Sequence, residues 1–233
     1  MNFFRITQAL ESILLEMILL VLFLPKTLFK IFINPGWIPS YLETELGRED
    51  DERFNHYSSP MATFLFLGAI PVFIVYAYSS GESLTVPFMQ GSNKYTLSLT
   101  EFFIFTSFIL LIGPLYMSIV YLNLLKRPFE KKELRKLVQV QAYLWSVPYC
   151  FYALGYIYNH IMHSDEIFNF AIEEIMISTG LGLLWMIFAN TILIKTQLKR
   201  SIITSVTIAI VSILFYLVGF FFTGEFIESS LRG

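Results

Sequence analysis

Five long apolar stretches, separated by short polar segments, dominate the sequence. They occupy residues 61–78, 102–122, 142–158, 175–194 and 202–222. A membrane-spanning helix needs about 20 mostly apolar residues, and in lipid every backbone polar group must be paired within its own segment. Because 55% of the residues are hydrophobic and only 15% are charged, one soluble core would not bury so much apolar sequence. The sequence therefore predicts an all-α integral membrane protein with five transmembrane helices.

Lys and Arg are distributed unevenly among the segments that connect these stretches. Of the 16 in the chain, five precede residue 61, six lie in 126–136 and three lie in 195–200, while the other two are Lys94 and Arg232. Because Lys and Arg favour the cytoplasmic side of a membrane, we expect a cytoplasmic N-terminus and an outer C-terminus. The many Phe residues and the short loops suit a bacterial inner membrane.

The chain opens with an apolar segment that is harder to assign. Residues 6–24 contain Glu16, and a charge at the centre of a span costs about 2.5–3.5 kcal/mol. Pro25 should end that helix, and Lys26 and Lys30 share one face of the apolar stretch that follows. We therefore expect two interfacial amphipathic helices on the cytoplasmic leaflet. The alternative is a sixth span over 6–24 with an outer N-terminus.

Residues 1–60 form a region that precedes the predicted five-helix domain of residues 61–233, and they end in a polar, acidic stretch, 34–60. On the same predicted side of the membrane lies the basic segment 126–136. Opposite charges on one face favour a surface that contacts a protein partner. The candidate contact residues are Asp50, Asp51, Glu52, Lys131, Lys132 and Arg135. The basic segment also suits anionic lipid head groups, or it is simply the topology signal. It is too short and too mixed in sign for nucleic acid.

Histidines and acids gather at the outer ends of the third and fourth stretches. They are His160, His163, Glu173 and Glu174. Imidazole and carboxylate groups are ligands of zinc, and the same groups make proton relays in membranes. Their spacing matches no known metal motif, and a polar loop beside a membrane explains them equally well. We therefore predict no metal site, with these four residues as the candidates if one exists.

The sequence has no other recognisable catalytic or cofactor-binding motif. It has no nucleophile–base arrangement, phosphate-binding loop or dinucleotide fingerprint, so we expect a non-enzymatic protein without a cofactor. Small residues, Ser205, Ala209 and Ser212, recur on one face of the fifth stretch. Small residues let membrane helices approach closely, so this face should pack against a helix of the same chain or of a second copy in a homo-oligomer.

The segment before the first stretch resembles that of the bacterial relatives of the Yip-domain family, five-span membrane proteins named as interactors of small GTPases. The resemblance is carried by the turn Asn34-Pro35-Gly36, the amphipathic stretch 41–46, the charged run 48–53 and the aromatic-to-proline segment 57–60. The Asp-Leu-Tyr-Gly-Pro signature of the eukaryotic members is absent, so no functional residue is carried over. The resemblance implies a non-enzymatic protein that scaffolds partners or shapes membranes.

Two functional hypotheses follow. The first is a membrane scaffold or adaptor of the Yip type, whose cytoplasmic face contacts a partner while the rest of the chain lies in the lipid bilayer. The alternative is a small oligomeric transporter or channel, including a membrane effector pore. It is motivated by a proline in the middle of three stretches, at Pro71, Pro114 and Pro148, since a proline inside a membrane helix bends it and frees a backbone carbonyl.

Overall fold

The computed structural model describes residues 2–49, 52–78, 99–162 and 172–232, with side chains described over 18–49, 52–70, 110–155, 157–158 and 177–218. Within these residues the chain is helical and has no strand. The elements are α1 (Asn2–Ile33), the 3-10 turn η1 (Pro35–Trp37), α2 (Ile38–Leu46), α3 (Pro60–Tyr78), α4 (Leu99–Leu124), α5 (Lys131–Met162), α6 (Ile172–Leu198) and α7 (Ile202–Arg232). The predicted all-α class is confirmed, and all five apolar stretches lie in helices.

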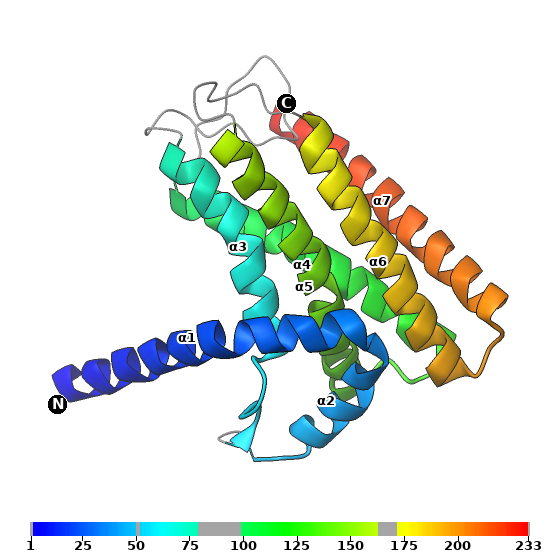
Figure 1. Ribbon diagram of the computed structural model, residues 1–233, viewed down its shortest axis with the longest axis horizontal. Helices are drawn as coiled ribbons and strands as arrows, with labels where there is room; N and C mark the ends of the chain where they lie inside the picture. Colours follow the sequence, from blue (N-terminus) through cyan, green and yellow to red (C-terminus); the bar gives the residue numbers. More distant parts are fainter. Residues whose placement is uncertain (1, 50–51, 79–98, 163–171, 233) are drawn as a thin grey trace.

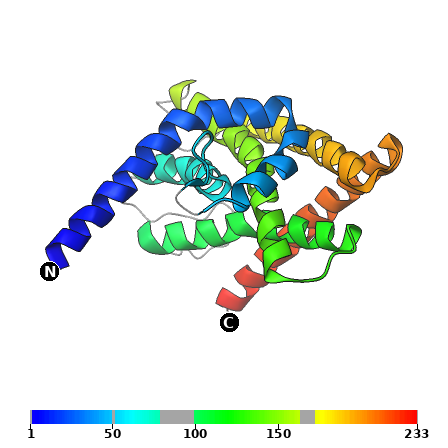
Figure 2. The ribbon, with the colours of Figure 1, turned by 90° about the horizontal axis from the view of Figure 1, so that it is seen from below.

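Helices α3 to α7 form a bundle, and α1 runs across it near one end (Figure 1). Helix α5 occupies the middle of the bundle, where it packs against α3, α4 and α6, while α7 lies on α6 and also meets α4. The short α2 packs against the first turns of α5. The N-terminal half of α1 projects away from the bundle (Figures 1 and 2), and the C-terminus lies at the end opposite α2.

The bundle exposes apolar side chains and buries several polar ones. On α6 the outward residues recur at i, i+4, i+7 and i+11, which forms a single stripe, and they are 50–64% exposed: Ile177, Leu181, Leu184 and Phe188. The opposite face buries Asn190 completely. A helix on the surface of a soluble protein shows the reverse pattern, with polar residues outward.

One described helix segment, Ile177–Leu198 within α6, is long and apolar enough to cross a membrane. Ile18–Ile33 and Pro35–Leu46 pass the same test only as a pair, and they meet at a bend of 102°. Three further apolar segments are shorter within the described residues: Pro60–Ile70, Leu110–Leu124 and Ile202–Val218. By length and composition the described chain therefore supports one span, and the other four predicted spans stay a prediction.

The prediction that Pro25 ends the first helix is wrong, because α1 continues through it to Ile33. Proline removes a single helical hydrogen bond, and two side chains add hydrogen bonds to carbonyls nearby. The Thr27 hydroxyl donates to the Phe23 carbonyl at 2.7 Å, and the Ser58 hydroxyl donates to the Leu20 carbonyl at 3.2 Å. Helix α1 bends partway along its length (Figure 2), as proline-containing helices do.

The predicted small-residue face of the fifth stretch is confirmed as a packing surface within the chain. Ser205 and Ala209 are fully buried, Ser212 is nearly so, and α7 packs on α6. Helices α5 and α6 also approach closely. A Cβ atom built on Gly182 would lie 2.9 Å from Pro148 Cα, so only glycine fits there without a shift of the backbone.

Replacing Gly182 by alanine tests this close approach. We expect Gly182→Ala to lower the free energy of unfolding by about 1–3 kcal/mol, because the new methyl group meets the backbone of α5. Gly180→Ala is the matched control, since a Cβ there meets nothing within 4 Å, and alanine favours a helix over glycine by about 1 kcal/mol. Thermal unfolding of both variants in detergent micelles measures the difference. Equal stability of the two variants would contradict the close packing.

Candidate functional site

A connected set of polar and aromatic contacts holds residues 34–59 against the end of α1 and the start of α5. We call the described part of this segment the cap. It contains η1, α2 and the residues from 52 to 59 that lead into α3. The cap is the part of the described chain where charged, aromatic and buried polar side chains meet, so it is the candidate functional site.

The cap begins where α1 ends, and proline and glycine set its path. Pro35 opens η1 and Pro39 lies in the first turn of α2, where proline fits because those N–H groups have no helical partner. Helix α2 then buries Ile38 and Leu42 and packs against α5. A Cβ on Gly36 would lie 3.2 Å from the Ile192 side chain, so η1 also touches α6 directly.

The end of α1 is bonded to α6. The Trp185 indole N–H donates to the Phe32 carbonyl at 3.2 Å, and the two rings stack with centroids 6.1 Å apart. This carbonyl belongs to the last turn of α1, where carbonyl groups have no N–H partner within the helix. The contact therefore caps α1 and joins it to the bundle.

Ser58 joins three segments through its backbone and side chain. Its N–H donates to the Thr27 hydroxyl at 3.0 Å, and its carbonyl accepts from the Tyr143 hydroxyl at 2.5 Å. Ser58, Thr27 and Tyr143 are all buried. These bonds satisfy polar groups that burial would otherwise leave without water, and they fix the start of α3 against α1 and α5.

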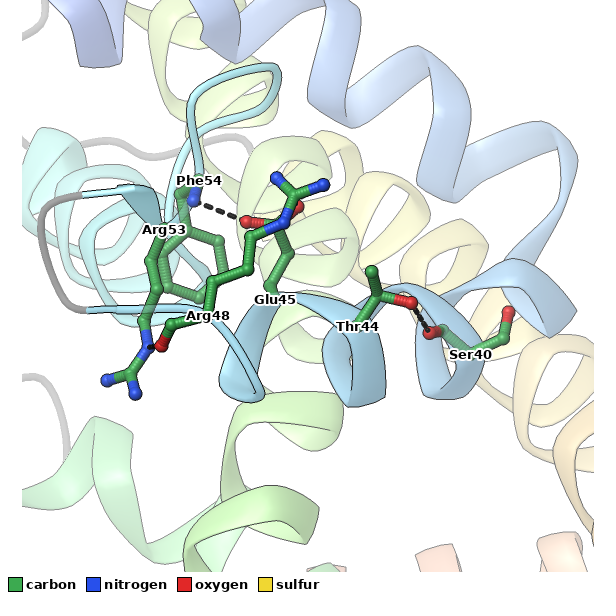
Figure 3. Close-up of polar contacts among 6 residues, drawn as sticks. All are labelled: Ser40, Thr44, Glu45, Arg48, Arg53 and Phe54. Carbon is green, nitrogen blue, oxygen red and sulfur yellow. Dashed lines mark hydrogen bonds and ion pairs between the residues drawn. The ribbon is translucent and has the colours of Figure 1, made fainter.

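Glu45 holds the rest of the cap segment against α2. Its carboxylate is 2% exposed, accepts the Phe54 N–H at 2.6 Å and pairs with the Arg48 guanidinium at 3.0 Å (Figure 3). The Arg53 guanidinium donates to the Arg48 carbonyl at 3.1 Å and to the Leu46 carbonyl at 3.3 Å. Phe54 has a φ of 60°, a conformation that costs a non-glycine residue about 1–2 kcal/mol. The charged hydrogen bond from Glu45 offsets that cost.

Three aromatic rings form the wall of the cap. Trp37 and Tyr41 stack with centroids 4.3 Å apart, and Tyr57 meets both rings edge-on at 4.8 and 5.3 Å. Two lysines of α1 lie over this wall, Lys26 at 4.6 Å from the Tyr57 ring and Lys30 at 5.8 Å from the Trp37 ring. Such contacts attract a cation to the ring face. Burial, with a smaller effect of the nearby Glu45 charge, raises the pKa of Tyr41.

The acidic and basic segments meet through two residues that were not among the predicted contact residues. Lys136 on α5 pairs with Glu43 on α2 at 3.0 Å, whereas Glu52 is exposed and pairs with no basic residue within the described part of the chain. Asp50 and Asp51 lie outside the described residues. The amphipathic pattern of α2 places Glu43 on its polar side, which marks Glu43 as a candidate for an external ion pair. The same pattern places Glu45 on the apolar side, which marks it as a buried charge that needs a partner.

The predicted basic contact residues lie together on the first turns of α5. Lys131, Lys132 and Arg135 are exposed, and within the described residues none of them forms an ion pair. Two basic neighbours are paired: Lys136 binds Glu43, and Arg127 binds Glu133 at 2.6 Å. We call these three residues the basic ridge. It is a cationic surface that no acidic side chain of the described residues neutralises.

The candidate metal or proton site falls mostly outside what the structure describes. His163 lies outside the described residues, and the side chains of His160, Glu173 and Glu174 are likewise outside them, although their backbones lie in α5 and α6. Among the residues whose side chains are described, no group of three His, Cys, Asp or Glu residues could hold a metal ion.

Comparison of the chain with known protein families, with curated proteins and with solved structures finds no match in any of the three.

Removing the Glu45 charge should release the cap segment. We expect Glu45→Gln to speed hydrogen exchange of the Phe54 amide by about tenfold or more, since a hydrogen bond to a charged group contributes about 1.5–3 kcal/mol. Hydrogen–deuterium exchange of the intact protein measures this. Glu49→Gln, which removes an exposed charge from the same segment, should leave that amide unchanged. Equal exchange in both variants would show that Glu45 does not hold the segment.

The Glu43–Lys136 pair should depend on pH. The hydrogen bond from Lys136, and then its charge, lower the pKa of the Glu43 carboxyl. Because the folded-state pKa lies below the unfolded one, the pair's stabilisation is present above the ordinary glutamate pKa and is lost as pH falls through the lowered value. Lys136→Met should raise the Glu43 pKa toward its ordinary range in a carboxyl NMR titration, and Lys132→Met should not. A Glu43 titration unaffected by Lys136→Met would contradict the pair.

Proposed function

We propose that the protein is a non-enzymatic, multi-pass membrane scaffold that presents the cap and the basic ridge to a protein partner on the cytoplasmic side. The observation that carries this proposal is the basic ridge. Its three charges stand exposed on a helix whose other charges are paired, beside a cap that is fixed to the bundle. The resemblance to the Yip-domain family, drawn from residues 34–60, favours the same class.

Exposed apolar stripes support a position within a bilayer. Besides the stripe on α6, helix α7 exposes five apolar residues on one side: Ile203, Val211, Leu214, Phe215 and Val218. Monomeric soluble proteins rarely expose apolar patches larger than a few hundred Å². Lipid in contact with both stripes would remove them from water, and α3, α4 and α5 complete the proposed five spans.

The aromatic wall supports a position of the cap at the cytoplasmic membrane surface. Trp and Tyr are enriched where a membrane meets water, and Lys side chains reach from apolar surroundings toward that boundary. The cap has both, with Trp37, Tyr41 and Tyr57 beside Lys26 and Lys30. Helix α1 runs across the bundle at this level (Figure 1), which favours an interfacial helix over a sixth span.

The rigid attachment of the ridge supports protein contact in addition to lipid attraction. The ridge extends from a helix that also binds α2 through the Lys136–Glu43 pair and Ser58 through Tyr143. Fixed charges favour recognition of one acidic partner surface, because complementary charge patterns set specificity and the rate of encounter. A flexible basic loop would be sufficient for lipid alone.

Charge reversal separates a specific surface from general attraction. Lys131→Glu/Lys132→Glu/Arg135→Glu should lower partner recovery by about tenfold or more after chemical cross-linking in native membranes. The control is Lys195→Glu/Lys199→Glu/Arg200→Glu, which reverses three exposed charges at the end of α6 and in the α6–α7 connection, on the same predicted side. Protease protection of a C-terminal tag confirms that neither variant changes topology. Equal losses in the two variants would overturn the proposed contact surface.

A small oligomeric transporter or channel is the second candidate. It is favoured by Pro114 inside α4 and Pro148 inside α5, since each frees a backbone carbonyl within the bundle. Proton and ion flux into proteoliposomes tests it, with Glu173→Gln/Glu174→Gln as the variant. Flux that this variant removes would replace the scaffold proposal, and the absence of flux from inserted protein would leave the scaffold in place.

A further inference from the structure

The interior of the bundle contains polar groups that the protein itself does not satisfy. Gln141 on α5 is fully buried, and neither its amide nitrogen nor its amide oxygen has a hydrogen-bond partner among the described residues. Trp145 lies one turn further along the same face of α5, is 5% exposed, and has an indole N–H without a protein partner. Each buried unsatisfied group costs about 1–3 kcal/mol, so two adjacent residues of this kind require an explanation.

Contacts of Trp145 place these groups between three helices. A Cβ on Gly113 of α4 would lie 2.9 Å from the Trp145 ring, and the Tyr216 ring of α7 lies 4.8 Å away, edge-on. Helices α4 and α5 are antiparallel, because the chain reverses between them over residues 125–130. One turn back from Trp145, Gln141 therefore lies level with Met117, which is one turn beyond Gly113 on α4.

Further polar side chains lie at this depth. On α7, Ser212 is buried and precedes Tyr216 by one turn. On α4, Tyr121 follows Met117 by one turn, and its hydroxyl donates to the Asn190 side-chain oxygen at 3.0 Å. The Asn190 amide nitrogen donates in turn to the Met186 carbonyl at 2.9 Å. We call Tyr121, Gln141, Trp145, Asn190 and Ser212 the polar layer.

The chemistry of the polar layer selects its ligand. The layer offers amide, indole and hydroxyl groups, which include both donors and acceptors, and it contains no charged side chain. Glu45, in the cap, is the one buried charged residue in the part of the chain with described side chains. An ion would lose its hydration without an opposite charge to replace it, which is strongly unfavourable. A small neutral molecule that both donates and accepts hydrogen bonds has no such cost.

We propose that the polar layer is a binding site for small uncharged molecules that donate and accept hydrogen bonds, with water as the simplest occupant. Buried waters in proteins commonly make about three hydrogen bonds to polar groups that lack other partners. A molecule at Gln141 would supply an acceptor for the Trp145 N–H and partners for both amide atoms. This site is separate from the basic ridge and holds whether or not the scaffold proposal does.

The three tryptophans provide the test, because each indole N–H gives its own NMR signal. In protein reconstituted into lipid nanodiscs, we expect magnetisation transfer from water to the Trp145 indole N–H and none to that of Trp185, which is bonded to the Phe32 carbonyl. We also expect the Trp145 signal to exchange in D2O at least about tenfold faster than the Trp185 signal. No transfer to Trp145, together with slow exchange, would overturn the proposal.

A second arm distinguishes water from larger neutral molecules. Acetamide, added below the concentration that shifts the Trp185 signal, should shift the Trp145 signal in a saturable way if the site admits solutes. A response to water alone supports the site and restricts its ligand to water.

Gln141→Leu should abolish the water transfer and the acetamide shift. It should also lower the Tm, because the hydrogen bonds between Gln141 and the bound molecule are lost. Ser146→Ala is the matched control, because Ser146 is buried on the same helix but bonded to the Ala142 carbonyl at 2.7 Å. It should leave the Trp145 signals unchanged. A higher Tm for Gln141→Leu would show that Gln141 is buried dry and would overturn the proposal. The wild-type NMR signals keep the proposal testable if the variant does not fold.

Discussion

Helix α5 is the element on which the bundle and the cap both depend. Its 32 residues correspond to about 48 Å, whereas the hydrocarbon core of a bilayer is about 30 Å thick. The additional turns at its start bring Lys136 to Glu43 of α2, and Tyr143, just beyond them, donates to the Ser58 carbonyl. Without these turns, α2 would lose its packing on α5.

The chain satisfies its charges and its buried polar groups in different ways. In the cap and at the start of α5, several charges are neutralised locally, since Glu45, Glu43 and Glu133 each have a basic partner. In the bundle, hydroxyl groups mostly donate to the carbonyl one turn earlier, as Ser118, Ser146 and Thr191 do. Gln141 is too long for that arrangement, so its amide has to find partners elsewhere.

Hydropathy predicted the helices of the bundle because long apolar runs leave the backbone no alternative to helix. It did not predict their full length. The start of α5 is polar, and polar residues continue a helix into water without an apolar signal. The break expected at Pro25 did not occur, because a proline removes a single helical hydrogen bond and α1 accommodates it by bending. Nearby, Ser58 adds a hydrogen bond to the Leu20 carbonyl, 38 residues away in sequence. Local rules cannot anticipate a donor that distant.

The lysines show the same limit at the candidate site. The spacing of Lys26 and Lys30 predicted that they share one face of a helix, but their positions over Tyr57 and Trp37 depend on the turn at Pro35, which returns the cap to α1. The residues of the basic ridge could be predicted from the sequence because they lie within five positions of one another. The burial of Glu45 was less readable, since it required knowing that the apolar side of α2 faces α5.

The Gly182–Pro148 contact also limits how the molecule can move. With backbone against proline and no intervening side chain, α5 and α6 cannot slide or roll past one another in small steps, as helices separated by flexible side chains can. Trp185 of α6 is hydrogen-bonded to the end of α1, and Gly36 of η1 lies close to Ile192 of α6. These elements therefore form one closely connected set. With these elements held together, a change of shape would have to move α3, α4 or α7 relative to them.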